Sequence, residues 1–235
     1  MITYHPFGDS ALLINFEQRI DPKINRKVIQ WYQAIKSAKI KGTTFCSPAY
    51  CSITIGYQPH QITFNALQER IASLEIHQGA ETKIRELKIP VCYDPKYALD
   101  LHQVSPKLGL TPDEVIALHT SVAYQVYMIG FLPGFTYMGT LHKKLECKRK
   151  ATPRLKVPAR SVGLAGLQTG IYPGEAPGGW QIIGRTPVEI FDSSKAEPYL
   201  FRPGDTVTFY SITAKEFLQM ENDPAAISWS EYVLS

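Results

Sequence analysis

The chain has 235 residues, of which 44% are hydrophobic and 20% charged, and its formal net charge is +4. This length and apolar content support a packed core, in one large domain or two small ones. The longest apolar stretches fall far short of the ~20 residues of a membrane helix. The first ten residues contain His5, Gly8 and Asp9 and no apolar segment of the signal-peptide kind. We therefore expect a soluble, cytoplasmic protein with no membrane partner.

Two further classes are disfavoured by composition. The four cysteines form no C-x-x-C pair, so we expect free thiols and no metal site. The longest basic run is Lys148-Arg149-Lys150, and no nucleic-acid reader motif is present. We therefore expect no nucleic-acid partner.

The first 82 residues alternate between strand and helix patterns. Residues 11–16 and 52–57 read as strands. Asp21 and Pro22 supply the N-cap and first position of a helix through residue 38, and Thr63 caps a second helix over 64–74. This order predicts a small α/β domain of the ferredoxin-like kind over residues 1–82. The polar stretch 77–82 is the expected boundary.

Residues 83–235 read as a second domain, and the whole chain as α+β. A strand over 84–93 precedes helices over 99–108 and 111–119, the second with a capping box of Thr111 and Glu114. Short strands separated by Gly and Pro turns follow, which predicts a closed β-barrel with helices at its edge. The expected strands are 123–129, 161–165, 168–172, 181–185, 188–191 and 206–210. A helix over 214–220 starts from Thr213.

Glycine and proline are concentrated between residues 130 and 187. Ten of the sixteen glycines and six of the seventeen prolines lie there, together with nine Lys or Arg and only two acids, Glu146 and Glu175. Aromatic side chains are interleaved with these turns, so we expect the loops to be folded onto other parts of the protein. Ordered loops, backbone N–H groups and excess positive charge together predict a surface that handles anions.

Three residues are candidates for catalysis, two in this region and one shortly before it. Arg154 follows Pro153, and Arg185 lies between Gly184 and Thr186. A guanidinium on a fixed turn suits bidentate capture of carboxylate or phosphate, although each arginine could instead bond loop carbonyls. His119 ends a helix, where it could transfer protons or simply interact with the helix dipole.

Further residues of the same loops are expected to contact substrate. Gln168, Thr169, Tyr137 and Tyr172 could donate or accept hydrogen bonds in a pocket wall, whereas the other aromatics would line it. The predicted substrate-binding set is Phe131, Pro133, Phe135, Tyr137, Gln168, Thr169, Tyr172, Gly178, Gly179 and Trp180.

Several catalytic motifs are missing from the sequence. There is no G-x-x-x-x-G-K-[ST], no G-x-G-x-x-G between a strand and a helix, and no G-x-S-x-G. We therefore do not expect a complete ATPase or serine hydrolase in this chain alone.

Linked motifs make the chain resemble a known family. They begin with Gly8-Asp9-Ser10-Ala11-Leu12-Leu13, continue at His119-Thr120-Ser121 and end at Gly184-Arg185-Thr186-Pro187. In this order, over nearly the whole chain, they are similar to the motifs of the 5-oxoprolinase B subunits. That family is also called allophanate hydrolase subunit 1 and includes the inhibitor of the sporulation histidine kinase A.

The resemblance implies a cyclophilin-like, carboxyltransferase-like barrel as the second domain. It implies partnership with the C and A subunits of 5-oxoprolinase in a complex that hydrolyses 5-oxoproline, a lactam, to glutamate with ATP, this chain being inactive alone. The ATP site would lie in the assembled complex, on this chain or on a partner. Two positions depart from the family: Arg160 stands where glycine is usual, and Ala176 where serine is usual.

Two alternatives stay open. One is a regulatory module that inhibits a sensor histidine kinase. The other is a subunit of a urea or amide carboxyltransferase, for which biotin would be on another chain, because no Ala-Met-Lys-Met occurs here.

Overall fold

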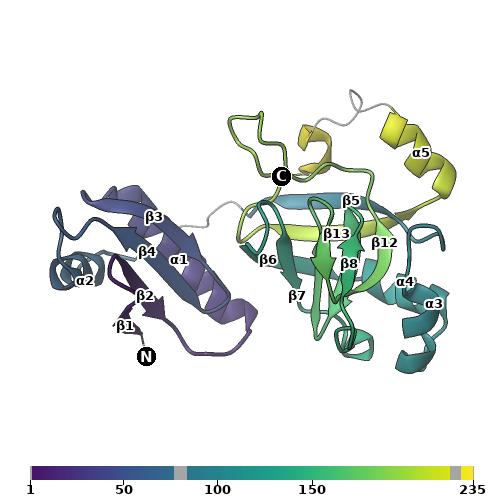
Figure 1. Cartoon of the computed structure of the whole chain (residues 1–235), viewed down its shortest axis with the longest axis horizontal. Coiled ribbons are helices and arrows are strands. Elements are labelled where there is room, and N and C mark those ends of the chain that lie inside the picture. Colours follow the sequence, from purple (N-terminus) through teal and green to yellow (C-terminus); the bar gives the residue numbers. More distant parts are fainter. Residues whose placement is uncertain (1, 77–83, 223–228, 235) are drawn as a thin grey trace. The chain divides into compact units, whose positions relative to one another are not determined.

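The computed structural model describes residues 2–76, 84–222 and 229–234. The chain divides into two compact units, Met1–Thr82 and Lys83–Ser235, drawn in Figure 1. The boundary that we predict at residues 77–82 lies outside the described residues. Across the described stretches, no helix has both the length and the apolar character needed to cross a bilayer.

The first unit is a four-stranded antiparallel sheet with two helices. Its strands are β1 (Thr3–Pro6), β2 (Ala11–Asn15), β3 (Thr43–Pro48) and β4 (Ser52–Tyr57), arranged in the order β1-β2-β4-β3. Helix α1 (Pro22–Ala38) follows β2, and α2 (Phe64–Ala72) follows β4. The order along the chain is therefore β-β-α-β-β-α rather than the β-α-β-β-α-β of a ferredoxin-like domain, and that part of our expectation is not confirmed.

Helix α1 begins where the sequence predicts. The Asp21 carboxylate accepts a hydrogen bond of 2.7 Å from the backbone N–H of Lys23, and Pro22 occupies the first turn. Ile24, Val28 and Ile35 are buried on one stripe. The helix packs against β3 and β4, so it covers one face of the sheet with its apolar side.

The second unit is built around a closed barrel of seven strands in the order β10-β7-β6-β13-β5-β12-β9. Their bounds are β5 Glu86–Cys92, β6 Ala123–Ile129, β7 Thr136–Gly139, β9 Ser161–Ala165, β10 Gln168–Ile171, β12 Gln181–Arg185 and β13 Thr206–Ile212. β5 and β13, which are the first and last barrel strands along the chain, pair in parallel. All other neighbouring strands of the barrel are antiparallel. The predicted closed barrel is confirmed, whereas its cyclophilin-like character stays a prediction.

Two short strands lie outside the barrel. β8 (Arg154–Val157) and β11 (Ala176–Gly178) form a separate antiparallel pair. Our expectation of a strand over 188–191 is wrong, because only Phe191 makes a bridge, to Tyr199. Val188 and Ile190 are buried in the barrel core, so their apolar character reflects burial rather than strand pairing.

Helices cover parts of the barrel. The expected helix over 99–108 is divided into α3 (Leu101–Val104) and the 3-10 turn η1 (Pro106–Leu108), because Pro106 cannot donate a backbone hydrogen bond. Helix α4 (Pro112–Thr120) has the predicted capping box, in which Thr111 Oγ1 accepts from the N–H of Glu114. The remaining elements are η2 (Lys143–Leu145), α5 (Ala214–Asn222) and η4 (Trp229–Tyr232).

Candidate functional site

The predicted aromatic residues form one cluster in the second unit. Phe135, Tyr172 and Trp180 are buried. The Phe135 ring centroid lies 4.9 Å from that of Tyr172 and 5.5 Å from that of Trp180, both edge-to-face. Tyr137 packs against the cluster from a half-buried position. The loops are thus folded onto a core of their own, as the sequence predicts, and most of these rings point inward.

Glycine makes this packing possible. A Cβ at Gly178 would lie 2.2 Å from the hydroxyl oxygen of Tyr172, so no other residue fits without a shift. The neighbouring Gly179 accepts a 2.7 Å hydrogen bond through its carbonyl from the N–H of Lys150. These two glycines therefore hold the aromatic cluster and the 147–152 segment together.

Phe131 and Pro133 differ from the other predicted pocket residues because both are exposed. The Phe131 side chain is 65% exposed, and its backbone has a φ of 72°, a left-handed conformation that is rare for a bulky residue. Its ring meets Phe135 edge-to-face at 5.8 Å. The turn thus presents one aromatic ring to solvent above the buried cluster.

Arg154 belongs to an ion cluster that the sequence does not reveal. Its two terminal nitrogens donate to both carboxylate oxygens of Asp100, at 2.6 and 2.7 Å. Lys150 Nζ donates to the same carboxylate at 2.9 Å, as does the backbone N–H of Ile182 at 2.8 Å. The planar fork of Arg154 is therefore occupied by a protein carboxylate. We call Asp100, Lys150 and Arg154 the Asp100 cluster.

The Asp100 carboxylate is fully buried and yet held in its charged form. Burial raises its pKa, but the hydrogen bonds from Arg154, Ile182 N–H and Lys150 outweigh that effect, so the pKa lies below its usual value. One negative charge is shared between two cations. The Asp100 cluster consequently keeps a net charge of +1.

Arg185 lies in a different environment. Its Nε donates to the carbonyl of Ala159 at 2.8 Å, and its guanidinium lies over the Phe217 ring. Glu221 of α5 approaches it at 3.9 Å and also pairs with Arg160. Burial, and then the nearby Arg160 charge, lower the pKa of Arg185. No contact joins Arg185 to the Asp100 cluster among the described residues, so the two predicted arginines do not share one clamp.

The backbone of Arg160 has the conformation expected of the glycine that the family resemblance implies at this position. Its φ is 67°, in the left-handed region that glycine adopts without strain. Its side chain donates to the carbonyl of Pro187 at 2.9 Å and to Glu221. The arginine thus ties the turn to α5.

His119 lies in the barrel interior with no exposed surface. Its Nδ1 is 2.7 Å from the Tyr93 hydroxyl and its Nε2 is 3.0 Å from Thr169 Oγ1. The chain of bonds is satisfied when Tyr93 donates to Nδ1, Nε2–H donates to Thr169, and Thr169 donates to the carbonyl of Gly163. Burial lowers the pKa of His119 to about 3.

In this position His119 and Thr169 contribute to the packing and hydrogen bonding of the barrel core. The ring stacks on Phe209 at 4.7 Å, and both nitrogens are engaged inside the core. The proton-transfer role of His119 and the substrate contact of Thr169 remain predictions without geometric support, because neither side chain reaches solvent.

Gln168 keeps an open donor. Its Nε2 is buried and has no hydrogen-bond partner among the described residues. A buried amide nitrogen without a partner is destabilising unless water or a ligand supplies an acceptor. Of the predicted polar residues, Gln168 is thus the one whose geometry best fits an orienting role.

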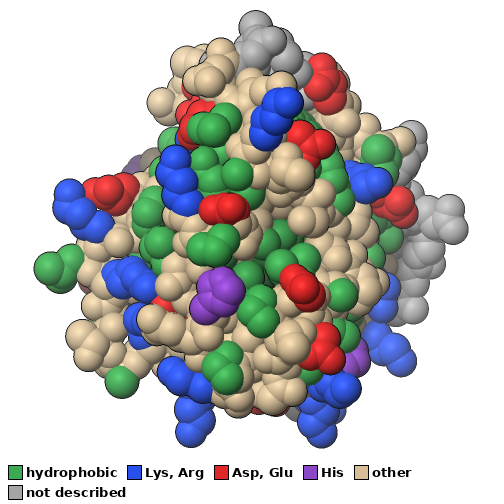
Figure 2. Space-filling model, turned by 90° about the vertical axis from the view of Figure 1, so that its right-hand side faces the viewer, with side chains coloured by type: hydrophobic (Ala, Val, Ile, Leu, Met, Phe, Trp, Pro, Cys, Tyr) green, Lys and Arg blue, Asp and Glu red, His purple; other side chains and the backbone are tan. Residues whose placement is uncertain are grey.

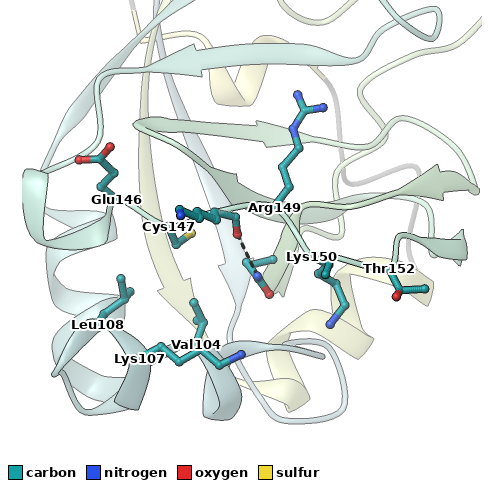
Figure 3. Close-up of a pocket in the computed structure, with 11 residues that line it drawn as sticks. Val104, Lys107, Leu108, Glu146, Cys147, Arg149, Lys150 and Thr152 are labelled. Atoms are coloured by element: carbon teal, nitrogen blue, oxygen red, sulfur yellow. Dashed lines mark hydrogen bonds between the residues drawn. The ribbon is translucent and has the colours of Figure 1, made fainter.

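A groove of about 520 Å³ opens beside the Asp100 cluster (Figure 3). Segment 146–152 forms one wall, α3 and η1 form another, and Gln181 of β12 closes it. In Figure 3 the Lys107 and Lys150 side chains point into the space between these walls, whereas Arg149 points away. Arg149 lies over the Trp180 ring at 5.9 Å, which joins the groove to the aromatic cluster.

Metal chemistry has no site in the described stretches. No group of three or more His, Cys, Asp or Glu side chains there could hold an ion, and all four cysteines are free thiols. The candidates for ligand contact are the groove, the Asp100 cluster and the aromatic cluster, together with Gln168 of β10.

Comparison with known sequences agrees with this architecture. The sequence model of the family described as carboxyltransferase domain, subdomain C and D, matches residues 2–201. The chain is 39% identical over 224 residues to the B subunit of the Bacillus subtilis 5-oxoprolinase, covering 89% of this chain and 92% of the relative. It is 36% identical to the protein of that name in Escherichia coli O157:H7, covering 86% and 92%. The chain therefore belongs to the family of 5-oxoprolinase B subunits.

Solved structures share the fold. TTHA0988 superposes with a TM-score of 0.80 at 34% identity, over 87% of this chain but only 40% of that longer chain. The urea amidolyase of K. lactis has a TM-score of 0.77 at 20% identity, over 94% of this chain and 15% of the other. The second similarity concerns the fold alone.

Proposed function

We propose that the chain is one component of a complex that hydrolyses 5-oxoproline to glutamate at the expense of ATP. The observation that carries this is the high identity, over most of both sequences, to relatives named as B subunits of 5-oxoprolinase. The C and A subunits are the proposed partners, the complex is cytoplasmic, and the chain has no activity by itself. In this proposal Arg154 and Arg185 do not bind one anion together, because the fork of Arg154 is occupied by Asp100 and Arg185 bonds the carbonyl of Ala159.

The chemistry explains why cationic and hydrogen-bonding groups are needed. A five-membered lactam is a stable amide, and transfer of a phosphoryl group from ATP to its carbonyl oxygen activates the carbonyl carbon toward water. Water adds to that carbon, and the ring C–N bond then breaks as the nitrogen takes up a proton to become the amino group. A second water displaces phosphate from the resulting acyl phosphate, which leaves glutamate and phosphate. Negative charge develops during this reaction and is stabilised by preorganised donors. We assign ATP to the assembled complex as a substrate, because the sequence lacks a phosphate-binding loop motif.

Within this proposal, Gln168 orients the substrate. Its Nε2 is a buried donor with no partner among the described residues, so a lactam or carboxylate oxygen can accept from it. Gln168→Met preserves the size of the side chain and removes the donor. We expect a loss of complex activity of about tenfold or more with no loss of stability. Unchanged activity would refute this role.

The partner subunits require an interaction surface. Phe131 is 65% exposed and Leu155 of β8 is 87% exposed. Figure 2 shows one face of the molecule, on which exposed hydrophobic side chains lie among Lys, Arg, Asp and Glu side chains. Exposed apolar side chains with a charged surround are typical of protein interfaces. We propose that the C subunit of 5-oxoprolinase buries Phe131 and Leu155.

The interface has a matched test. Asparagine tolerates the left-handed φ of position 131. Phe131→Asn should therefore fold normally and weaken binding to the C subunit by at least tenfold, as measured by a titration monitored by size-exclusion chromatography. Phe7→Asn, at an exposed phenylalanine of the first unit, is the control and should leave the affinity unchanged. Equal affinity of the two variants would refute the assignment of Phe131.

The activity is tested by reconstitution. ATP hydrolysis that depends on 5-oxoproline should occur only when this chain and its partners are all present. Turnover by the purified chain alone, or full activity of the partners without it, would overturn the proposal.

A carboxyltransferase component is the second candidate. The matching family is described as a carboxyltransferase domain, and the chain has the fold of a urea amidolyase segment. In the test, separate chains supply the biotin carrier and the carboxylase. Transfer of the carboxyl group from carboxybiotin to an amide would then favour the carboxyltransferase function over the first proposal.

A further inference from the structure

We propose that the groove between segment 146–152 and α3–η1 is a binding site for a phosphate-bearing anion. Its lining includes Lys107, Lys148 and Lys150 against one acid, Glu146, which is a net charge of +2 without Arg149, whose side chain points away from the space. This inference is independent of the proposed hydrolase function, because it rests only on the groove.

The cationic segment is fixed in place without being helix or strand over most of its length. Cys147 exchanges two backbone hydrogen bonds with Gly166, and Gln181 Nε2 donates to the carbonyl of Lys148 at 3.0 Å. The N–H of Lys150 donates to the carbonyl of Gly179 at 2.7 Å. The lysines of an ordinary surface loop are mobile and solvated. Here three successive anchors hold the backbone, so a ligand has less conformational entropy to restrict.

The side chain of Lys150 is held in place as well as its backbone. One of its three N–H donors is used by the buried Asp100 carboxylate at 2.9 Å, and an ammonium group has two more. That carboxylate is shared with Arg154, so it does not neutralise both cations. Lys107 makes no ion pair among the described residues, and its ammonium group faces the same space (Figure 3).

The identity of the cations favours phosphate over carboxylate. Planar carboxylates are matched by the arginine fork, whereas lysine binds phosphate as a point charge. The fork of Arg154 is occupied by Asp100, and Arg149 lies over Trp180. Lys107, Lys148 and Lys150 remain, and several lysines suit a ligand with two or more negative charges.

The size and the apolar wall limit the ligand to a small molecule. A volume of about 520 Å³ lies within the range of small-molecule pockets. Val104 and Leu108 provide an apolar side, which can cover an organic group attached to the phosphate. Phosphate chemistry is shared by inorganic pyrophosphate and by nucleotides, and the experiment distinguishes them.

The test is isothermal titration calorimetry on the full chain with pyrophosphate, ATP, adenosine and acetate. We expect pyrophosphate to bind, acetate to bind at least tenfold more weakly, and the pyrophosphate affinity to fall as salt increases. ATP that binds more tightly than pyrophosphate, with adenosine competing, would identify a nucleotide as the ligand. Equal binding of the two would identify the phosphate group alone.

Matched variants separate the groove from general charge attraction. Lys107→Ala and Lys148→Ala should each weaken pyrophosphate binding about tenfold, the effect of one charged hydrogen bond. Lys156 of β8 lies outside the groove, in an exposed ion pair with Glu175. Lys156→Ala removes the same charge and should change the affinity less than twofold. Absence of pyrophosphate binding, equal binding of acetate, or equal losses in all three variants would overturn the inference. None of these measurements needs the partner subunits or turnover, so a failure here leaves the proposed hydrolase function to its own test.

Discussion

Replacing Asp100 with asparagine should destabilise the second unit strongly. The carboxylate is fully buried and accepts hydrogen bonds from Arg154, Lys150 and the N–H of Ile182. An asparagine removes the charge and turns an NH₂ group toward donors. Breaking a buried ion pair on one side costs about 3–5 kcal/mol.

The structure places Asp100→Asn at the lower end of that range. The Arg154 and Lys150 side chains are 24% and 23% exposed, so they can turn toward water when the carboxylate is lost. We therefore expect a loss of about 3 kcal/mol in the free energy of unfolding. For a unit of this size, that corresponds to a Tm lower by about 6–12 °C.

The pH dependence gives an independent check. Because the pKa of Asp100 is lowered in the folded state, its stabilising effect is complete above the unfolded value of about 3.9. The effect is lost as the pH falls from that value through the lower folded pKa. The difference in stability between wild type and Asp100→Asn should be constant from about pH 5 to 8 and shrink below about pH 4.

Urea unfolding followed by near-UV circular dichroism measures both effects. Glu175→Gln is the control, because it removes one negative charge from an exposed pair with Lys156 and should change stability by less than about 0.5 kcal/mol. A loss for Asp100→Asn as small as that of the control would refute the reasoning that the Asp100 cluster stabilises the fold.

Three further predictions concern other parts of the second unit. The pKa of buried His119 is about 3, so below about pH 6.5 the unfolded chain binds one proton more at this residue than the folded chain does. Stability should therefore fall toward pH 3 by up to about 1.4 kcal/mol per pH unit. His119→Gln should flatten this slope of stability against pH, and an unchanged slope would contradict the assignment. Gly178→Ala should lower stability by about 1–3 kcal/mol, because its Cβ would lie 2.2 Å from the Tyr172 hydroxyl, and Tyr172→Phe should recover part of the loss in a double variant. Arg160→Gly should be more stable than Arg160→Ala by about 1 kcal/mol, and should have the higher Tm. Both variants lose the contacts with Glu221 and Pro187, but only glycine relieves the strain of the φ of 67°. The reverse order of Tm values would refute the strain argument.

Local signals in the sequence predict much of the fold. The Asp21 and Thr111 caps mark the starts of α1 and α4, and alternation marks β4, because hydrogen bonds and burial at these places involve neighbouring residues. The strands β8 and β11 escape prediction, because β11 consists of Ala-Pro-Gly, β8 has only four residues, and their pairing connects residues about twenty positions apart. The ββαββα order of the first unit likewise depends on strand pairing rather than on local pattern.

Only one wall of the groove, segment 146–152, lies in the region 130–187 where the sequence predicts anion handling; the α3–η1 wall lies outside it, and none of the predicted site residues lines the groove. The charge excess and the basic run at Lys148 mark the segment that lines the groove. The role of Asp100 could not be read from the sequence, because the residue lies 54 positions from Arg154 and its importance arises only when the barrel brings them together. Arg154 and Arg185 look alike in sequence, yet one meets a carboxylate and the other a loop carbonyl.

The parallel pairing of β5 with β13 sets the order in which the protein can form during synthesis. Glu86 pairs with Thr206 and Cys92 with Ile212, and the other neighbour of β5, the strand β12, meets it at Cys92 and Arg185. Strand β5 therefore leaves the ribosome long before either of its partners exists. The first unit has no such delay, because its last described helix ends at Ala72. We expect the first unit to fold cotranslationally, while closure of the barrel waits for the final strand and, being dominated by long-range contacts, proceeds more slowly.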